Sequence, residues 1–270
     1  MLVYHGQELV FERYLNGHTA DRPHVLASGT KSFCGAMLCC AAEDGLLTFD
    51  EKVADTITEW KDHPRKSRIT LRQLLSLTSG LDAGTIGGVP TYAAALETEA
   101  KFEPGTRFAY GPVPFQIFGE VMRRKLADKK EDALDYLQRR IFTPISLKYG
   151  VWREGADKLP HLPSGAFITA REWAKFGLLI RDMGRWQGKQ IIPEARLREC
   201  FIGSKAGRSY GLTFWLGNGR AGPKDLVMAA GKGKQKLYIM PSLNLLVVQF
   251  ADTSKYSEDT FLNLLLKGSV

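Results

Sequence analysis

The sequence predicts an α/β protein in which a helical domain is inserted into a sheet domain. Strand patterns lie near both ends of the chain, and a block of helical patterns over residues 50–148 separates them. This order is typical of a sheet domain that carries an inserted helical domain. We assign residues 1–27 and 149–270 to the sheet domain and residues 28–148 to the helical domain. A chain of 270 residues is long enough for two such domains packed together.

The first elements are a hairpin and a buried helix. Two apolar runs, Leu2–Tyr4 and Leu9–Phe11, flank a short polar segment with a glycine, which predicts a hairpin over residues 2–14. Residues 28–44 alternate small and large apolar residues without a proline, and Gly45 is a suitable residue to end a helix. Because this segment is apolar over most of its helical surface, we expect the helix to be buried.

Helical patterns then fill the middle of the chain. Asp50 and Thr70 each head a segment with the residue types of a helix N-terminus. A glycine-rich loop is expected over residues 80–90. The same rules predict further helices at 91–100, 114–127, 131–142 and 170–183, strands at 209–216, 225–230, 235–240 and 245–251, and a last helix at 257–267.

Composition limits the class of protein. Hydrophobic residues make up 44% of the chain and charged residues 24%, which is ordinary for a globular protein. No apolar run reaches the 18 residues of a candidate transmembrane helix, so we expect none. The net charge of +8 comes from scattered lysines and arginines, with only short clusters at Arg123–Lys125 and Lys232–Lys236. We therefore expect a solvated basic surface and no nucleic-acid partner.

The cysteines and histidines do not form a recognisable metal, disulfide or triad pattern. The five histidines are dispersed, no pair has metal-ligand spacing, and no Gly-x-Ser-x-Gly segment is present. The four cysteines suit neither a disulfide framework nor a zinc site, so we interpret them as buried apolar residues. They are Cys34, Cys39, Cys40 and Cys200. We therefore expect no metal and no cofactor.

Ser28 and Lys31 form the strongest candidate for catalysis. They lie three residues apart at the start of the predicted helix, so both side chains would share one helix face. A serine hydroxyl needs a nearby base to become a nucleophile. A lysine in an apolar wall has its pKa lowered by desolvation and can accept a proton. Taken alone, Ser-x-x-Lys also occurs by chance, with Ser28 as a helix cap and Lys31 as a surface residue.

The surroundings of this pair resemble the superfamily of class C β-lactamases, penicillin-binding proteins and related carboxylesterases. That resemblance rests on five segments in the family's order, which together extend over most of the chain. They are Ala27–Phe33 around the nucleophile, Leu46–Val53, Ile69–Leu81 (similar to "TLRHLLSHTSGL"), Glu103–Tyr110 (similar to "PGTRFAYSN") and Thr169–Gly177 (similar to "TARDLARFG").

The resemblance implies an antiparallel sheet with helices on both faces, a mostly helical domain alongside, and an active site in the cleft between the two. The family's first helix and first strand would precede Met1. We therefore expect an N-terminal truncation. Relatives of this kind are often exported, whereas the chain itself begins without a signal peptide, which slightly favours a cytoplasmic location.

Tyr110 matches the family's catalytic tyrosine, and a neighbouring lysine ammonium would lower its pKa and let it carry the serine proton. The sequence departs from the family two residues later. Pro112 stands where the family has asparagine, and proline offers no side-chain hydrogen bond to a substrate amide. The departure favours ester cleavage over β-lactam or peptide cleavage.

The third motif is also altered. Lys232, Gly233 and Lys234 occupy the family's Lys-Thr-Gly or His-x-Gly position, with Lys234 where glycine is usual. The resemblance implies that the three residues contact substrate and that the backbone N–H groups of Ser28 and Gln235 form an oxyanion hole. The alternative is that these lysines have no role in substrate binding. Lysines are also common on solvent-exposed edge strands, where their charge prevents pairing with other chains.

These observations predict a serine hydrolase that cleaves a small carboxylic ester through an acyl-enzyme. A β-lactamase or a D-amino-acid peptidase or amidase of the same family is the alternative. The altered Pro112 and Lys234 also leave open a catalytically silent binding or sensor module. Because two lysines stand near the predicted site, we expect an anionic substrate to be favoured.

Overall fold

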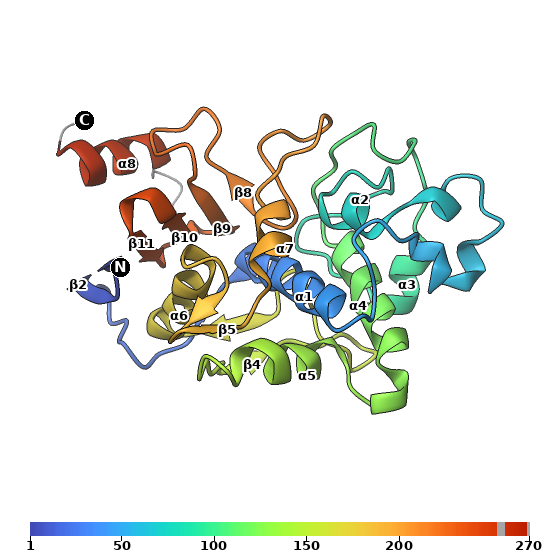
Figure 1. Cartoon of the computed structure of the whole chain (residues 1–270), viewed down its shortest axis with the longest axis horizontal. Helices are drawn as coiled ribbons and strands as arrows, with labels where there is room; N and C mark the ends of the chain where they lie inside the picture. Colours follow the sequence, from blue (N-terminus) through green and yellow to red (C-terminus); the bar gives the residue numbers. More distant parts are fainter. Residues whose placement is uncertain (253–256, 269–270) are drawn as a thin grey trace.

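A computed structural model describes residues 1–252 and 257–268 and has one large antiparallel sheet at its centre (Figure 1). The strands follow the order β2-β1-β11-β10-β9-β8, and all neighbouring pairs are antiparallel. Both the sheet and its antiparallel pairing agree with the predicted fold class. The strands are β1 (Leu2–His5), β2 (Glu8–Glu12), β8 (Trp215–Leu216), β9 (Val227–Gly231), β10 (Gln235–Met240) and β11 (Leu245–Gln249).

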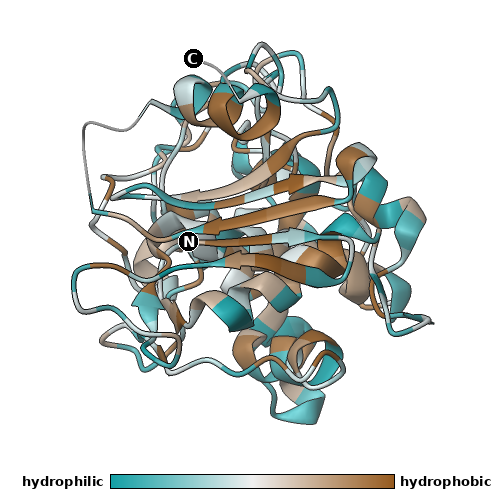
Figure 2. Ribbon diagram, turned by 90° about the vertical axis from the view of Figure 1, so that its left-hand side faces the viewer, coloured by the Kyte–Doolittle hydropathy of each residue, from teal (hydrophilic) through white to brown (hydrophobic). Residues whose placement is uncertain are grey.

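Helices cover both faces of this sheet because the central strands are apolar on both sides. On one face, α8 (Glu258–Lys267) packs Leu262 against Tyr238 and Val247. On the other face, α6 (Ala170–Arg181) lies close to β10 and β11, where Gly177 leaves no room for a side chain against Leu246. Figure 2 shows the largely hydrophobic strands between α8 and the helices of the opposite face.

The helical part of the molecule lies beside the sheet, at the right of Figure 1. Its helices share one continuous hydrophobic core with the helix α1 (Ser32–Glu43), whose residues Ser32–Ala41 are all buried. The helices are α2 (Leu71–Leu75), α3 (Tyr92–Leu96), α4 (Val113–Lys125) and α5 (Ala133–Leu137), which continues into a π-helical turn at Gln138–Phe142. Short 3₁₀ turns connect them at Val53–Asp55, Thr58–Trp60, Lys66–Arg68 and Ala127–Lys129.

A second, three-stranded sheet leads the chain into the candidate site. Its order is β3-β5-β4, with β3 at His24–Val25, β4 at Val151–Trp152 and β5 at Ala166–Ile168. The chain passes from β3 into a 3₁₀ turn at Ala27–Lys31 and then into α1. The remaining elements are a hairpin of β6 (Arg185–Trp186) and β7 (Lys189–Gln190), the short helix α7 (Glu194–Glu199) and a 3₁₀ turn at Pro241–Leu243.

Several predicted elements are shorter than their patterns indicate, and one helix is absent. Asp50 starts no helix, because its carboxylate binds Arg72 and Lys52 forms a bridge with Thr70, so the chain is extended there. The predicted strand 209–216 is reduced to Trp215–Leu216, since Thr213 has a φ of 70°. The predicted helix 91–100 is α3 alone, and the predicted helix 28–44 is divided into the 3₁₀ turn and α1.

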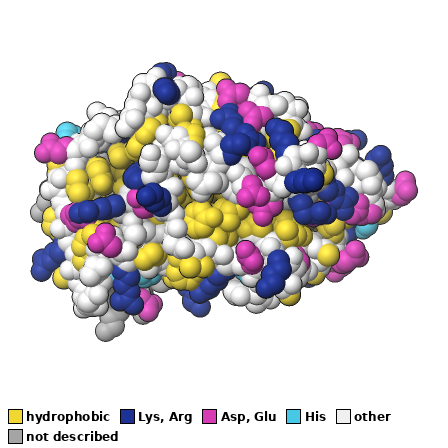
Figure 3. All heavy atoms as spheres, turned by 90° about the horizontal axis from the view of Figure 1, so that it is seen from below, with side chains coloured by type: hydrophobic (Ala, Val, Ile, Leu, Met, Phe, Trp, Pro, Cys, Tyr) yellow, Lys and Arg dark blue, Asp and Glu magenta, His cyan; other side chains and the backbone are white. Residues whose placement is uncertain are grey.

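Charged groups on the surface are mixed in sign. On the face in Figure 3, Lys and Arg side chains lie beside Asp and Glu side chains. Ion pairs such as Arg72–Asp50 and Arg124–Glu59 account for part of the basic residues. Within the two described ranges, no helix combines the length and the apolar character needed to cross a membrane.

Candidate active site

A sharp turn of the backbone presents Ser28. The Leu26 N–H donates to the Ala166 carbonyl at 2.9 Å, which keeps β3 paired up to that residue. Ala27 then has a φ of 45°, in the left-handed region. An L-residue pays roughly 1–2 kcal/mol for that conformation. The turn places Ser28 at the head of the helical segment, where the first N–H groups lack intrahelical acceptors and favour negative charge.

Lys31 is buried beside Ser28 without an acidic partner. Its side chain is 4% exposed, and its Nζ donates to Ser28 Oγ at 3.1 Å and to the Pro163 carbonyl at 3.0 Å. The rings of Tyr110 and Phe115 each have their centroid 5.1 Å from Nζ. Among the residues that the structure describes, no carboxylate forms an ion pair with Lys31.

Burial lowers the pKa of Lys31 to about 7, with the neighbouring Cys34 thiol acting in the opposite direction. At neutral pH a substantial fraction of the amine is therefore unprotonated. An unprotonated amine at hydrogen-bond distance from a hydroxyl is suitably placed to accept its proton. Cys34 itself is buried, and burial raises the pKa of its thiol, so it suits packing better than chemistry.

Tyr110 approaches from the helical part of the molecule, directly before α4. The backbone is held there by the Ala109 N–H, which donates to the Leu77 carbonyl at 2.9 Å. Gly111 fits because any Cβ at that position would collide with the Ala83 carbonyl. The Tyr110 ring lies 5.4 Å from that of Trp215, in an aromatic cluster that reaches β8. Packing from both sides thus fixes the position of the phenol.

The pKa of Tyr110 moves in the opposite direction from our expectation. Burial raises it, and hydrogen bonds to Ser28 and Trp215 only partly offset that effect. The Lys31 amine lies over the ring face and is itself only partly charged near neutral pH, so it does not stabilise a phenolate as the sequence suggested. Tyr110 therefore stays a neutral phenol, which can donate a proton but is a poor base.

A cavity of about 200 Å³ joins these side chains, and we call it the Ser28 cavity. Pro112 and Lys232 also line it, as the sequence suggested for substrate contact. The structure adds residues that carried no signal in the sequence, above all the exposed cation Arg153. Its complete lining is Val25, Ala27, Ser28, Lys31, Ile86, Gly87, Val89, Tyr110, Gly111, Pro112, Arg153, Pro163, Ser164 and Lys232.

The other residues of the altered third motif lie apart from this cavity. Gly233 and Lys234 form the turn between β9 and β10, with φ angles of 81° and 69°, and neither lines the cavity. Gln235 begins β10, opposite Gly231 of β9, and its buried side-chain amide donates to the Lys232 carbonyl at 3.2 Å. The oxyanion role expected for the Gln235 N–H stays a prediction.

The residues that our sequence reasoning missed come from loops. Arg153 follows β4, Pro163 and Ser164 precede β5, and Ile86 and Val89 belong to the predicted glycine-rich loop. Their residue types are common in loops, so only their spatial position identifies them. Within the described ranges, no group of three His, Cys, Asp or Glu side chains is suited to hold a metal ion.

Comparison with known proteins places this geometry in context. A model of the Beta-lactamase family matches residues 1–267 of the chain. An uncharacterised protein of Alkalihalophilus pseudofirmus is 21% identical over 72% of this chain and 61% of its own length. Protein flp of Staphylococcus aureus strain MW2 is 24% identical over 51% of this chain and 30% of its own length. The chain thus spans less than two thirds of these curated relatives.

Solved structures share the fold over nearly the whole chain. A protein described as a 6-aminohexanoate-dimer hydrolase from Bacillus anthracis has a TM-score of 0.81 and 23% identity, covering 96% of this chain and 74% of its own. A protein described as a beta-lactamase from Bacteroides dorei has a TM-score of 0.80 and 20% identity, covering 99% and 92%. The hydrolase EstCE1 has a TM-score of 0.76 and 15% identity, covering 94% and 88%.

Proposed function

The chain belongs to the beta-lactamase family, and from that premise we propose that it is a serine hydrolase that cleaves a small carboxylic ester or a related amide. The observation that carries the proposal is the buried Lys31 amine, 3.1 Å from the Ser28 hydroxyl and without an acidic partner in the described residues. Burial of an amine without an acidic partner costs desolvation free energy, and a nucleophilic serine requires a base at this distance.

Acylation follows from the protonation states of the three side chains. The unprotonated fraction of Lys31 accepts the Ser28 proton while Oγ forms a bond to the substrate carbonyl carbon. The Tyr110 phenol then donates its proton to the leaving alkoxide and recovers one from the Lys31 ammonium. The carbon–oxygen bond to the alcohol breaks, and the acyl group stays on Ser28. Water releases it as the acid, which restores the enzyme.

The oxyanion of the tetrahedral intermediate needs hydrogen-bond donors. The Ser28 N–H, at the head of the helical segment, is one candidate. A second donor is expected from the end of β9 and its turn, where the Cβ that Gly231 lacks would collide with the Leu26 carbonyl, two residues before Ser28. We further propose that the cleft lies between a helical domain, residues 28–148, and a sheet domain formed by the remainder. The Ser28 cavity takes residues from both.

The cavity favours small esters. Its walls include the apolar side chains of Val25, Ile86 and Val89, and its volume is about 200 Å³. Pro112 offers no donor or acceptor from its side chain to hold a substrate amide. Cleavage of a β-lactam or a D-amino-acid amide is the alternative within the family, and one similar structure, from Bacillus anthracis, is described as a 6-aminohexanoate-dimer hydrolase.

Two exposed cations at the mouth of the cavity, Lys232 and Arg153, favour substrates that carry a carboxylate away from the scissile bond. Neither forms an ion pair with an acidic side chain in the described part of the chain. A bound molecule in so small a cavity lies within reach of both charges. This preference rests on the proposed hydrolase activity and adds a substrate class to it.

A fluorophosphonate probe, followed by nitrophenyl esters and nitrocefin, tests the proposal on the wild type and on Ser28→Ala. We expect the probe to label Ser28, short-chain esters to be cleaved, and nitrocefin to be cleaved more slowly, with all three signals lost in Ser28→Ala. Faster turnover of nitrocefin than of every ester would favour the β-lactamase alternative. No labelling of a folded wild-type protein would favour a silent binding module.

A further inference from the structure

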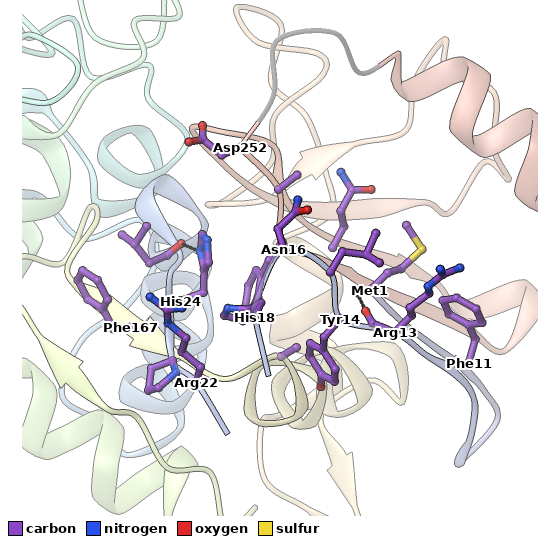
Figure 4. Close-up of a pocket in the computed structure, with 17 residues that line it drawn as sticks. Met1, Phe11, Arg13, Tyr14, Asn16, His18, Arg22, His24, Phe167 and Asp252 are labelled. Carbon is purple, nitrogen blue, oxygen red and sulfur yellow. Dashed lines mark hydrogen bonds between the residues drawn. The ribbon is translucent and has the colours of Figure 1, made fainter. Parts of the chain in front are cut away.

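A second cavity, four times larger than the first, adjoins it at β3. Its volume is about 810 Å³, and Val25 lines both cavities. We call it the His24 cavity. Figure 4 shows its walls, which come from the segment after β2, from β3 and β5, and from the chain after β11. Apart from Val25, the residues that line it are different from those of the Ser28 cavity, so we treat it as a separate site.

One wall of the His24 cavity is formed by stacked aromatic rings, with His24 at the end of the stack. Trp173, buried in the core, stacks on Phe250 with centroids 5.6 Å apart and planes 12° apart. Phe250 in turn stacks on His24 at 4.8 Å and 16°. His18 meets both His24 and Phe250 edge-on, at 77° and 88°. Phe250 covers one face of the His24 ring, so a further planar ring in the cavity would continue the stack.

The charged groups around this stack favour an anion. Arg22 lines the cavity next to His18 and forms no ion pair within the described ranges. The nearby Glu12 is already bound to Arg171, at 2.7 Å, and to the Tyr14 hydroxyl. Asp252 is the acidic residue of the lining, and Figure 4 places it apart from Arg22, at the opposite rim.

A polar atom without a partner lies in the same corner. His18 Nε2 is buried and makes no hydrogen bond in the structure. Burial lowers the pKa of this imidazole, with His24 and Arg22 adding to the effect, which favours the neutral ring, and a neutral imidazole carries one N–H that it can donate. Buried polar groups are normally paired, and an unpaired one at a cavity wall is satisfied by a ligand or a water molecule.

We propose that the His24 cavity binds a planar aromatic acid, with its ring stacked on His24 and its carboxylate at Arg22 and His18. The stack supplies the flat apolar surface, the guanidinium supplies the charge, and the unpaired imidazole nitrogen supplies a directed hydrogen bond. The cavity has the size of ordinary small-molecule sites, whereas the Ser28 cavity is smaller than these. The inference is independent of the proposed hydrolase activity.

Calorimetric titration with 2-naphthoate, and with 2-naphthamide as the uncharged molecule of the same ring system, tests the proposal. We expect one naphthoate per chain and at least tenfold weaker binding of the amide. Arg22→Gln should weaken naphthoate about tenfold and leave the amide unchanged. Arg185→Gln, an exposed arginine outside both cavities, is the matched control and should bind as the wild type does.

Two further measurements distinguish binding in the His24 cavity from a folding defect of the variant and from binding in the Ser28 cavity. Stacking on His24 should shift the imidazole proton resonances of His24 upfield when naphthoate is added, even if Arg22→Gln folds poorly. Lys232→Met reports on the Ser28 cavity and should leave naphthoate binding unchanged. Equal binding of acid and amide, loss of binding in Lys232→Met but not in Arg22→Gln, or no binding at all would each overturn the proposal.

Discussion

Two buried lysines in different parts of the molecule show what separates a candidate base from a structural residue. Lys31, at the start of α1, and Lys66, in the 3₁₀ turn before α2, are 4% and 7% exposed. Each lies over an aromatic ring, at 5.1 Å from Tyr110 and 5.0 Å from Trp60. Each amine also donates to a backbone carbonyl, that of Pro163 at 3.0 Å and that of Leu96 at 2.9 Å.

The difference lies in what else each amine meets. Lys31 contacts a serine hydroxyl and opens onto a cavity, and burial lowers its pKa to about 7. Burial also lowers the pKa of Lys66, but the nearby Glu97 carboxylate raises it in turn, and Lys66 lines neither cavity described above. Burial and an aromatic neighbour are therefore common to both. Lys31 differs from Lys66 because it contacts the Ser28 hydroxyl in a cavity, and this contact makes Lys31 a candidate catalytic base.

The largest expected effect separates the two lysines directly. Lys31→Met removes the proposed base and should lower kcat for a nitrophenyl ester by about 10²–10⁴-fold. Lys66→Met keeps the stem of the side chain and should leave kcat unchanged, because that amine touches no reacting group. Ester kinetics on both purified variants check this. A comparable loss in the two variants would show that the comparison reports on folding and not on catalysis.

A comparison of the partly buried Tyr110 with the buried Tyr92 sharpens the same contrast. Tyr110→Phe removes the proposed proton donor, and we expect kcat to fall by about 10²-fold. Tyr92 is 2% exposed, and its hydroxyl donates to the Pro160 carbonyl at 3.1 Å, away from the Ser28 cavity. Tyr92→Phe should therefore cost about 1 kcal/mol of stability and leave kcat intact. Thermal melts beside the kinetics distinguish the two outcomes, and a full kcat in Tyr110→Phe would contradict its role.

The lowered pKa of Lys31 predicts how activity depends on pH. Below about pH 7 the amine is protonated and cannot act as a base, so kcat/KM should fall about tenfold per pH unit and level off above that value. The Lys66→Met variant should keep this profile. A profile without an inflection between pH 6 and 8 would assign the base role to another group.

The same pKa makes a prediction about stability. The folded state binds the Lys31 proton less tightly than the unfolded chain, where the pKa is near 10.5. Stability should therefore rise as the pH increases from about 7 towards 10.5, and this contribution is lost in Lys31→Met. Urea unfolding of both proteins at several pH values measures it. An unchanged slope in the variant would mean that Lys31 is not desolvated in the folded protein.

The smallest expected effect concerns Lys232, which unlike Lys31 and Lys66 is exposed, at the mouth of the Ser28 cavity. Lys232→Met should raise the KM of a carboxylate-bearing ester several-fold, about tenfold at most, and leave its neutral analogue nearly unchanged. Arg153→Gln should act in the same direction. Added salt should weaken the preference in the wild type, since exposed charges are screened over about 10 Å at 0.1 M. Equal changes for both esters would instead indicate a structural or catalytic role.

Several elements that depend only on residues close together in the chain were predicted correctly from the sequence. The hairpin of β1 and β2, the buried helix ended by Gly45, and the strands β10 and β11 follow from local apolar periodicity and turn residues. The three-residue spacing of Ser28 and Lys31 on one helical turn is of the same kind, because helix geometry alone brings such side chains together. The Beta-lactamase family match over residues 1–267 then confirms the family that the five segments indicated.

Only the tertiary structure determines the properties of the site that depend on residues far apart in the sequence. The Lys31 amine is held by the carbonyl of a residue 132 positions later, and the rings of Tyr110 and Phe115 help to bury it. The raised pKa of Tyr110, the position of the Arg153 cation at the cavity and the pairing of Gln235 with Gly231 have the same origin. Desolvation and cavity shape each depend on many contacts, and these contacts form only when the chain folds. A local sequence pattern therefore indicates which groups can react, and packing determines their charge states and what they face.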